Sequence, residues 1–201
     1  MKKGIAVAAF VLLLCGGGQA IAARHDSVVT WRNIVGVITA PGVDNPVAVT
    51  LDNRGNVVSQ IHSGTLPWVT REGSASVDLT TGAVEFTVSG LVLNGGNAAG
   101  TAGPINQVVG TLICNPGGSD AQQPQVVLDT QPVALSTRGN ARFSGELTGA
   151  VPNECGTPLF LIRIGPAFGP FAGRWLATGV EPRIGAAHEF AGGHDHEHER
   201  R

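Results

Sequence analysis

Tyrosine is absent from this chain, and its two lysines and single methionine all fall within the first three residues. Without a lysine beyond Lys3, the body of the chain has neither a Schiff-base amine nor the lysine of a phosphate-binding P-loop. Without tyrosine it has no phenolic acid or nucleophile. These absences exclude several classes of catalytic site. Cysteine is also scarce, with three in 201 residues.

The first 22 residues have the three-part form of a secretory signal peptide. Met1-Lys2-Lys3 is a basic start, residues 6–14 form a short apolar run, and Ala20-Ile21-Ala22 supplies small residues for cleavage. Cys15 follows Leu14 rather than a small residue, which argues against processing as a lipoprotein. We therefore predict a secreted protein, periplasmic or extracellular, that does not span the membrane.

The charge that remains after cleavage argues against a nucleic-acid partner. Removing Lys2 and Lys3 from the 13 basic residues leaves 11 arginines against 15 acidic residues, a formal net charge of −4. A phosphate polymer is held mainly by basic side chains, so this balance does not favour one.

Two cysteines remain in the predicted mature chain, Cys114 and Cys155. An exported protein with an even number of cysteines most often oxidises them, so we predict one structural disulfide. No Cys-x-x-Cys arrangement is present for a redox role, and no ligand cluster surrounds them for a zinc site.

From residue 27 onward, short stretches rich in Val, Ile, Thr and Leu alternate with Gly, Pro, Asn and Asp, which is the pattern of strands and turns. The clearest hairpin spans 74–93, where apolar and polar residues alternate on both sides of Thr80-Thr81-Gly82. Further strands are predicted at 28–39 (one strand or a bent pair), 47–51, 57–63, 107–114, 126–129, 133–136, 141–147, 159–164 and 175–180. We predict an all-β fold, an antiparallel β-sandwich with a closed barrel as the alternative. One domain over 23–180 would be followed by a disordered, charged, His-rich tail over 181–201.

Aromatic residues provide one candidate binding surface. Trp68, Phe168 and Phe171 lie in Pro- and Gly-rich surroundings, and exposed rings of this kind bind carbohydrates or partner proteins. The alternative is that the rings fold inward and seal one end of the core. The loops 94–106, 115–124 and 165–173 are candidate contact surfaces.

Histidines near the chain ends provide candidate metal ligands for zinc, copper or nickel. His194, His196 and His198 alternate with acidic residues in the tail. Cleavage after Ala22 would place His25 third in the mature chain, an arrangement suited to Cu(II) or Ni(II). The alternative is a solvated low-complexity tail. The sequence requires no cofactor beyond these optional metals.

His62 is the only histidine within the predicted domain apart from His25 near its start, so any histidine-based hydrolysis would depend on it. Its neighbour Ser63 would point to the opposite side of a strand. Arg163 interrupts an apolar strand and, if buried, would need a partner. We favour an internal Asp or Glu, or exposure at a strand end, over a bound carboxylate ligand. We assign no catalytic residue. The leading prediction is a secreted, non-enzymatic β-sandwich with a binding or envelope-structural role; the alternatives are an exported metal-binding protein and a hydrolase using His62.

Overall fold

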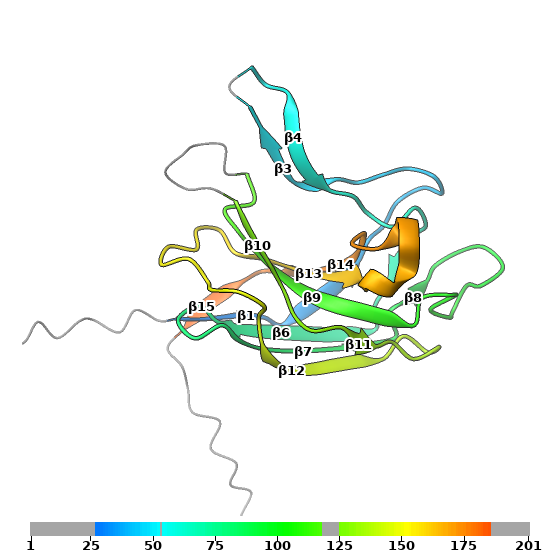
Figure 1. Ribbon diagram of the computed structural model, residues 1–201. Coiled ribbons are helices and arrows are strands. Elements are labelled where there is room, and N and C mark those ends of the chain that lie inside the picture. Colours follow the sequence, from blue (N-terminus) through cyan, green and yellow to red (C-terminus); the bar gives the residue numbers. More distant parts are fainter. Residues whose placement is uncertain (1–26, 53, 118–124, 186–201) are drawn as a thin grey trace, which may run out of the picture.

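The computed structural model describes residues 27–52, 54–117 and 125–185, which fold into two antiparallel sheets packed face to face (Figure 1). Sheet A has the order β12 (Ala141–Glu146), β7 (Ala83–Ser89), β6 (Glu72–Asp78), β1 (Val28–Trp31) and β15 (Arg183–Gly185). Sheet B has the order β10 (Val126–Asp129), β9 (Gln107–Cys114), β13 (Leu159–Ile164), β14 (Trp175–Val180) and β2 (Asn33–Gly36), and β11 (Val133–Ala134) also pairs with β9. Over the described residues neither sheet closes into a barrel, so the predicted sandwich is confirmed.

Three smaller elements complete the described chain. Strands β3 (Val47–Leu51) and β4 (Val57–Ile61) form a hairpin that stands away from the sandwich at the top of Figure 1. Strand β5 (Trp68–Val69) pairs with β8 (Val92–Leu93). A short 3₁₀ helix, η1 (Pro166–Phe171), connects β13 to β14.

The hairpin β6–β7 shows how the alternating sequence builds one wall of the core. On β7, Val84, Phe86 and Val88 are buried, while Glu85 and Thr87 between them are exposed. Successive strand residues point to opposite faces, so this alternation places the apolar set against sheet B. Gly82 occupies the turn with a φ of +77°, a conformation that glycine adopts without steric cost.

Aromatic rings join the two sheets at the centre of the core. The ring of Phe160 on sheet B lies 5.4 Å from that of Trp31 and 5.9 Å from that of Phe86, both on sheet A. Gly110 on β9 leaves room for this cluster, because a Cβ there would lie 2.8 Å from the Phe86 ring. The core is therefore formed by inward-facing residues of both sheets.

The predicted disulfide is confirmed. Cys114, at the end of β9, is bonded to Cys155 in the connection that leads to β13, with a Cα–Cα distance of 4.7 Å. The bond ties the end of a central strand to the 147–158 connection.

The stretch 28–39, predicted as one strand or a bent pair, is a bent pair, with β1 in sheet A and β2 in sheet B on either side of Arg32. The C-terminal boundary of the fold differs from the prediction. The predicted tail begins at Glu181, but Arg183–Gly185 forms β15 and pairs with β1. The described fold thus extends five residues beyond the boundary at 180, and the rest of the predicted tail lies outside the described residues.

Candidate binding pocket

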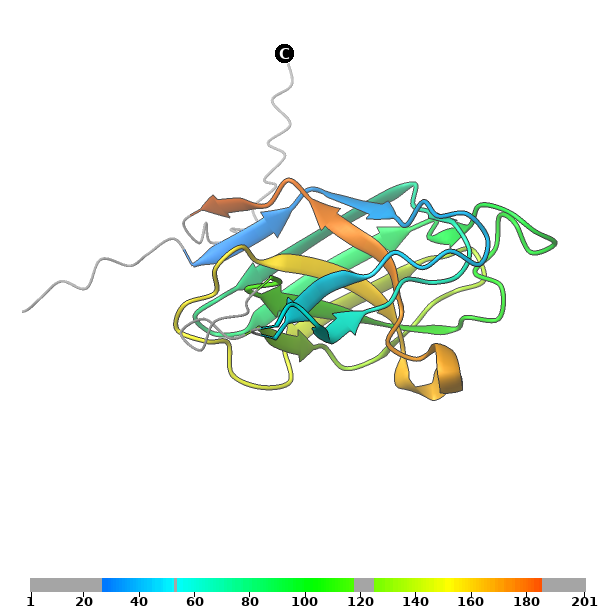
Figure 2. The same cartoon turned by 90° about the horizontal axis from the view of Figure 1, so that it is seen from above.

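An apolar pocket of about 160 Å³ lies at the end of the sandwich that carries η1. Figures 1 and 2 show η1, β8 and the 94–106 loop gathered at this same end of the molecule. Its walls come from four separate stretches of chain and include Leu66, Trp68, Leu93, Ile105, Phe168 and Phe171.

The pocket brings together all three aromatic residues singled out in the sequence, but not as a flat exposed surface. Trp68 is only 3% exposed and packs within the core cluster. Phe168 is partly buried against the same cluster, whereas Phe171 is 46% exposed. The exposure of the three rings therefore increases from the inside of the pocket outward. Trp68 forms the inner wall and Phe171 contacts solvent.

Trp68 is fixed by its backbone. Its N–H donates to the carbonyl of Val37 at 2.8 Å, and β5 pairs it with Leu93 on β8. Gly36 permits this contact, because a Cβ at that position would lie 2.3 Å from the Trp68 carbonyl oxygen. Strand β2 of sheet B thereby holds the inner wall of the pocket in place.

Phe168 and Phe171 are presented by a closed loop. The N–H of Gly173 donates to the carbonyl of Ile164, and the N–H of Ile164 donates to that of Arg174, both at 2.9 Å. These bonds close the β13–β14 connection at its base. The loop contains η1, a short helical segment where the sequence, rich in Pro and Gly, predicts a loop without helix.

The loop 94–106 contributes buried side chains to the core and to the pocket wall. Ala102 and Ile105 are buried, and Ile105 lines the pocket beside Pro104. A segment predicted as a surface loop therefore supplies part of the apolar wall.

Arg174 marks the polar side of the pocket. Its Nη1 donates to the carbonyl of Ser63 at 2.8 Å. Within the described part of the chain, no carboxylate lies at ion-pair distance from it. Arg174 also lines a second, polar pocket of about 240 Å³ beyond η1, together with Gln60, His62 and Arg163.

Arg163 has an internal acidic partner, as predicted for a buried arginine in this strand. Its Nη1 lies 3.0 Å from Oδ1 of Asp129, and its Nε donates to the carbonyl of Gly173 at 2.7 Å. Thr111 donates to the same Asp129 oxygen at 2.6 Å. The guanidinium is thus neutralised within the fold.

His62 pairs with Asp44, through its Nδ1 and the Oδ2 of the carboxylate. The other carboxylate oxygen accepts from the backbone N–H of Ser63 at 2.9 Å. Ser63 is fully buried while His62 is half-exposed, yet both side chains reach the same carboxylate, because Ser63 Oγ donates to Oδ1 of Asp44 at 3.3 Å. The prediction that they point to opposite sides of a strand is wrong, since β4 ends at Ile61, before both residues. The remaining nitrogen, Nε2, contacts the amide of Gln60 at 3.4 Å, and no hydroxyl among the described residues hydrogen-bonds to it.

Burial raises the pKa of the Asp44 carboxyl, but the hydrogen bonds from His62 and Ser63 outweigh that effect and hold it below the usual value of 3.8. Asp44 therefore stays ionised at neutral pH and is equipped to orient His62. The arrangement gives His62 an acidic partner without giving it a nucleophile from the described chain.

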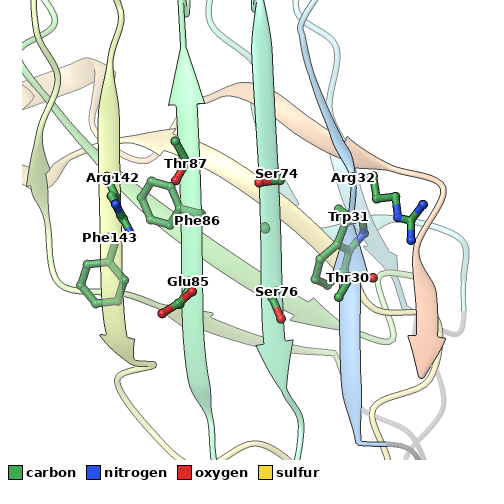
Figure 3. A pocket seen from close by; sticks show the side chains of 11 residues that line it. Thr30, Trp31, Arg32, Ser74, Ser76, Glu85, Phe86, Thr87, Arg142 and Phe143 are labelled. Atoms are coloured by element: carbon green, nitrogen blue, oxygen red, sulfur yellow. The ribbon is translucent and has the colours of Figure 1, made fainter. Parts of the chain in front are cut away.

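A third hollow, of about 370 Å³, lies on the outer face of sheet A (Figure 3). Short side chains on β6 form its floor, with Ser74 paired to Thr87 and Ser76 paired to Glu85. Arg32 and Arg142 stand on opposite sides of it in Figure 3. Although it is the largest of the three, its side chains are those of a solvated sheet face, and Trp31 and Phe86 are buried on the core side. We therefore place the candidate site at the apolar pocket, where ligand burial has a hydrophobic driving force.

The candidate metal ligands His25, His194, His196 and His198 lie outside the described residues. Among the residues that are described, no group of three His, Cys, Asp or Glu side chains is placed to hold a metal ion. In those same residues, no helix is long and apolar enough to cross a membrane.

No family model matches this chain, and the searches of curated proteins and of solved structures found no match either. A function for the protein must therefore be inferred from the geometry of the pockets.

Arg174, the residue shared by the two pockets, was not predicted from the sequence. Nothing local distinguishes it, because a residue next to the buried Trp175 at the start of a strand is expected to point toward solvent. The same holds for Leu66 and Ile105, which resemble other apolar loop residues in the sequence.

Proposed function

We propose that the protein is a secreted, non-enzymatic binding module whose apolar pocket receives a ring-sized apolar group. One observation carries the proposal: Trp68, Phe168 and Phe171, from two distant stretches of chain, converge on a single apolar pocket. Aromatic side chains offer large contact areas at small entropic cost, which suits them to binding. A pocket with apolar walls and few polar groups is the usual form of a small-molecule site.

The volume limits what the pocket can hold. Drug-sized ligands occupy pockets of about 300–1,000 Å³. A dry apolar cavity of about 150 Å³ in another protein takes up benzene, which is close to the pocket of about 160 Å³ here. The proposed ligand therefore inserts one aromatic ring or one short branched alkyl group.

The size of the buried group also sets the expected affinity. Burying about 150 Å² of apolar ligand surface at about 25 cal/mol per Å² contributes about 4 kcal/mol. The loss of translational and rotational freedom on binding offsets part of this, so we expect a Kd of about 1 mM or higher. Binding of an isolated ring should be weak and measurable by NMR.

Indole is a suitable neutral probe. Titration of the ¹⁵N-labelled protein should give saturable shifts confined to amides around β5, β8 and η1. Phe171→Ala removes an exposed part of the wall and should weaken binding with little loss of stability, while Leu66→Trp should fill the pocket and block it. Ile184→Ala and Val57→Trp change exposed apolar residues elsewhere and serve as matched controls.

The proposal fails if indole produces no saturable shifts, or if its shifts are spread over the surface. It also fails if Phe171→Ala and Leu66→Trp bind indole as well as their controls do.

A further inference from the structure

Arg174 lines both pockets that flank η1, one apolar and one polar. We propose that these two pockets form one site for a small amphipathic acid, with its apolar ring among Trp68, Phe168 and Phe171 and its carboxylate on Arg174. This inference rests on the proposed function, because the ring must first enter the apolar pocket.

The charges around η1 leave Arg174 as the group that an anion would meet. Arg163 is neutralised by Asp129, and His62 is paired with Asp44. Arg174 is half-buried and donates to the neutral carbonyl of Ser63, with no carboxylate of the described chain at ion-pair distance. A partly desolvated charge without a counter-charge is unfavourable, so a bound anion would stabilise it.

A guanidinium is well suited to a carboxylate. It presents five N–H donors in a planar fork, and one of its nitrogens in Arg174 already donates to Ser63. The others can bind both oxygens of a carboxylate in parallel, which is the stronger form of a charge-assisted hydrogen bond.

The surroundings select a monoanion of limited size. Because Arg163 and His62 are already paired with Asp129 and Asp44, the polar pocket offers one uncompensated positive charge, on Arg174, which a single negative charge balances. The apolar pocket of about 160 Å³ accommodates one ring. The chemical class is therefore an aryl or short branched-chain monocarboxylic acid.

The test compares 3-phenylpropionate with its neutral analogue 3-phenylpropanol, both titrated by NMR. The acid should bind the unmodified protein about tenfold more tightly than the alcohol, as expected for one charge-assisted contact to a half-buried guanidinium. Arg174→Gln should remove that difference: because Arg174 also lines the apolar pocket, both ligands can lose affinity, but the acid should lose about tenfold more than the alcohol. Arg183→Gln, which removes an exposed arginine of β15, is the matched control and should preserve it.

The outcomes separate the two proposals. Equal binding of the acid and the alcohol to the unmodified protein overturns this inference but leaves the proposed apolar site intact. If neither ligand binds, both this inference and the proposed function are overturned. An acid preference that survives in Arg174→Gln also overturns the inference. If that variant does not fold, Arg174→Lys keeps the charge but not the planar fork, and an acid preference undiminished in it would contradict bidentate binding.

Discussion

The guanidinium of Arg163 on β13 reaches across β9 to the carboxylate of Asp129 on β10, with 3.0 Å between Nη1 and Oδ1. Thr111, on the strand between them, donates to the same carboxylate oxygen. The side chain of Arg163 is 16% exposed and that of Asp129 is 42% exposed, so the charge pair is only partly desolvated. It links three neighbouring strands of sheet B beside the polar pocket.

Replacing Asp129, the acidic member of this ion pair, should destabilise the fold. Asp129→Ala leaves a mostly buried guanidinium without its counter-charge, and we expect a loss of about 2 kcal/mol in the free energy of unfolding, below the range for fully buried pairs because Asp129 is partly solvated. Urea denaturation would measure it. Glu72→Ala, at an exposed position at the start of β6, should change stability by less than about 0.5 kcal/mol. An Asp129→Ala loss no larger than this control would show that the pair contributes little.

The disulfide should contribute more than any single side-chain contact. Closing a loop of 41 residues is worth about 4 kcal/mol on the chain-entropy model. We expect Cys114→Ala/Cys155→Ala to lower the free energy of unfolding by that amount, alanine being preferred because Cys114 is fully buried. Reductant should lower the urea midpoint of the unmodified protein and leave that of the double variant unchanged. Equal midpoints for the double variant and the oxidised unmodified protein would contradict the prediction.

The sequence alone was sufficient to predict a strand and its buried face where apolar residues alternate with polar ones over several positions. Val84, Phe86 and Val88 repeat every second position, and that period alone determines which side of β7 faces the core. Cys114 and Cys155 could be paired because no third cysteine remained in the predicted mature chain.

The pocket could not be predicted in the same way, because its parts are local fragments without a period. Strand β5 has two residues, and the position of Trp68 depends on Leu93 and on the close approach of Gly36, both distant in sequence. The exposed residues Arg183–Gly185 pair with β1 although they have the composition of a tail. Such features arise from tertiary contacts that override local preference.

The pairing of Asp44 with His62 should appear in the pH dependence of stability. The pKa of Asp44 is lowered in the folded state, so its carboxylate contributes stability above the usual value of 3.8, and that contribution is lost as the pH falls through the lower, folded-state pKa. Because both side chains are partly exposed, we expect the contribution to be below about 1 kcal/mol.

Asp44→Asn tests this directly. At pH 7 the variant should unfold at a lower urea concentration than the unmodified protein, and the difference should shrink as the pH falls below the usual carboxyl pKa of 3.8. Glu72→Gln, which removes one carboxylate from an exposed position, controls for the change in net charge. A difference that stays constant from neutral to strongly acidic pH would mean that the substituted amide disturbs packing rather than removing an ionic contact. A larger difference at low pH would reverse the sign and contradict the assignment of Asp44 as a stabilising anion.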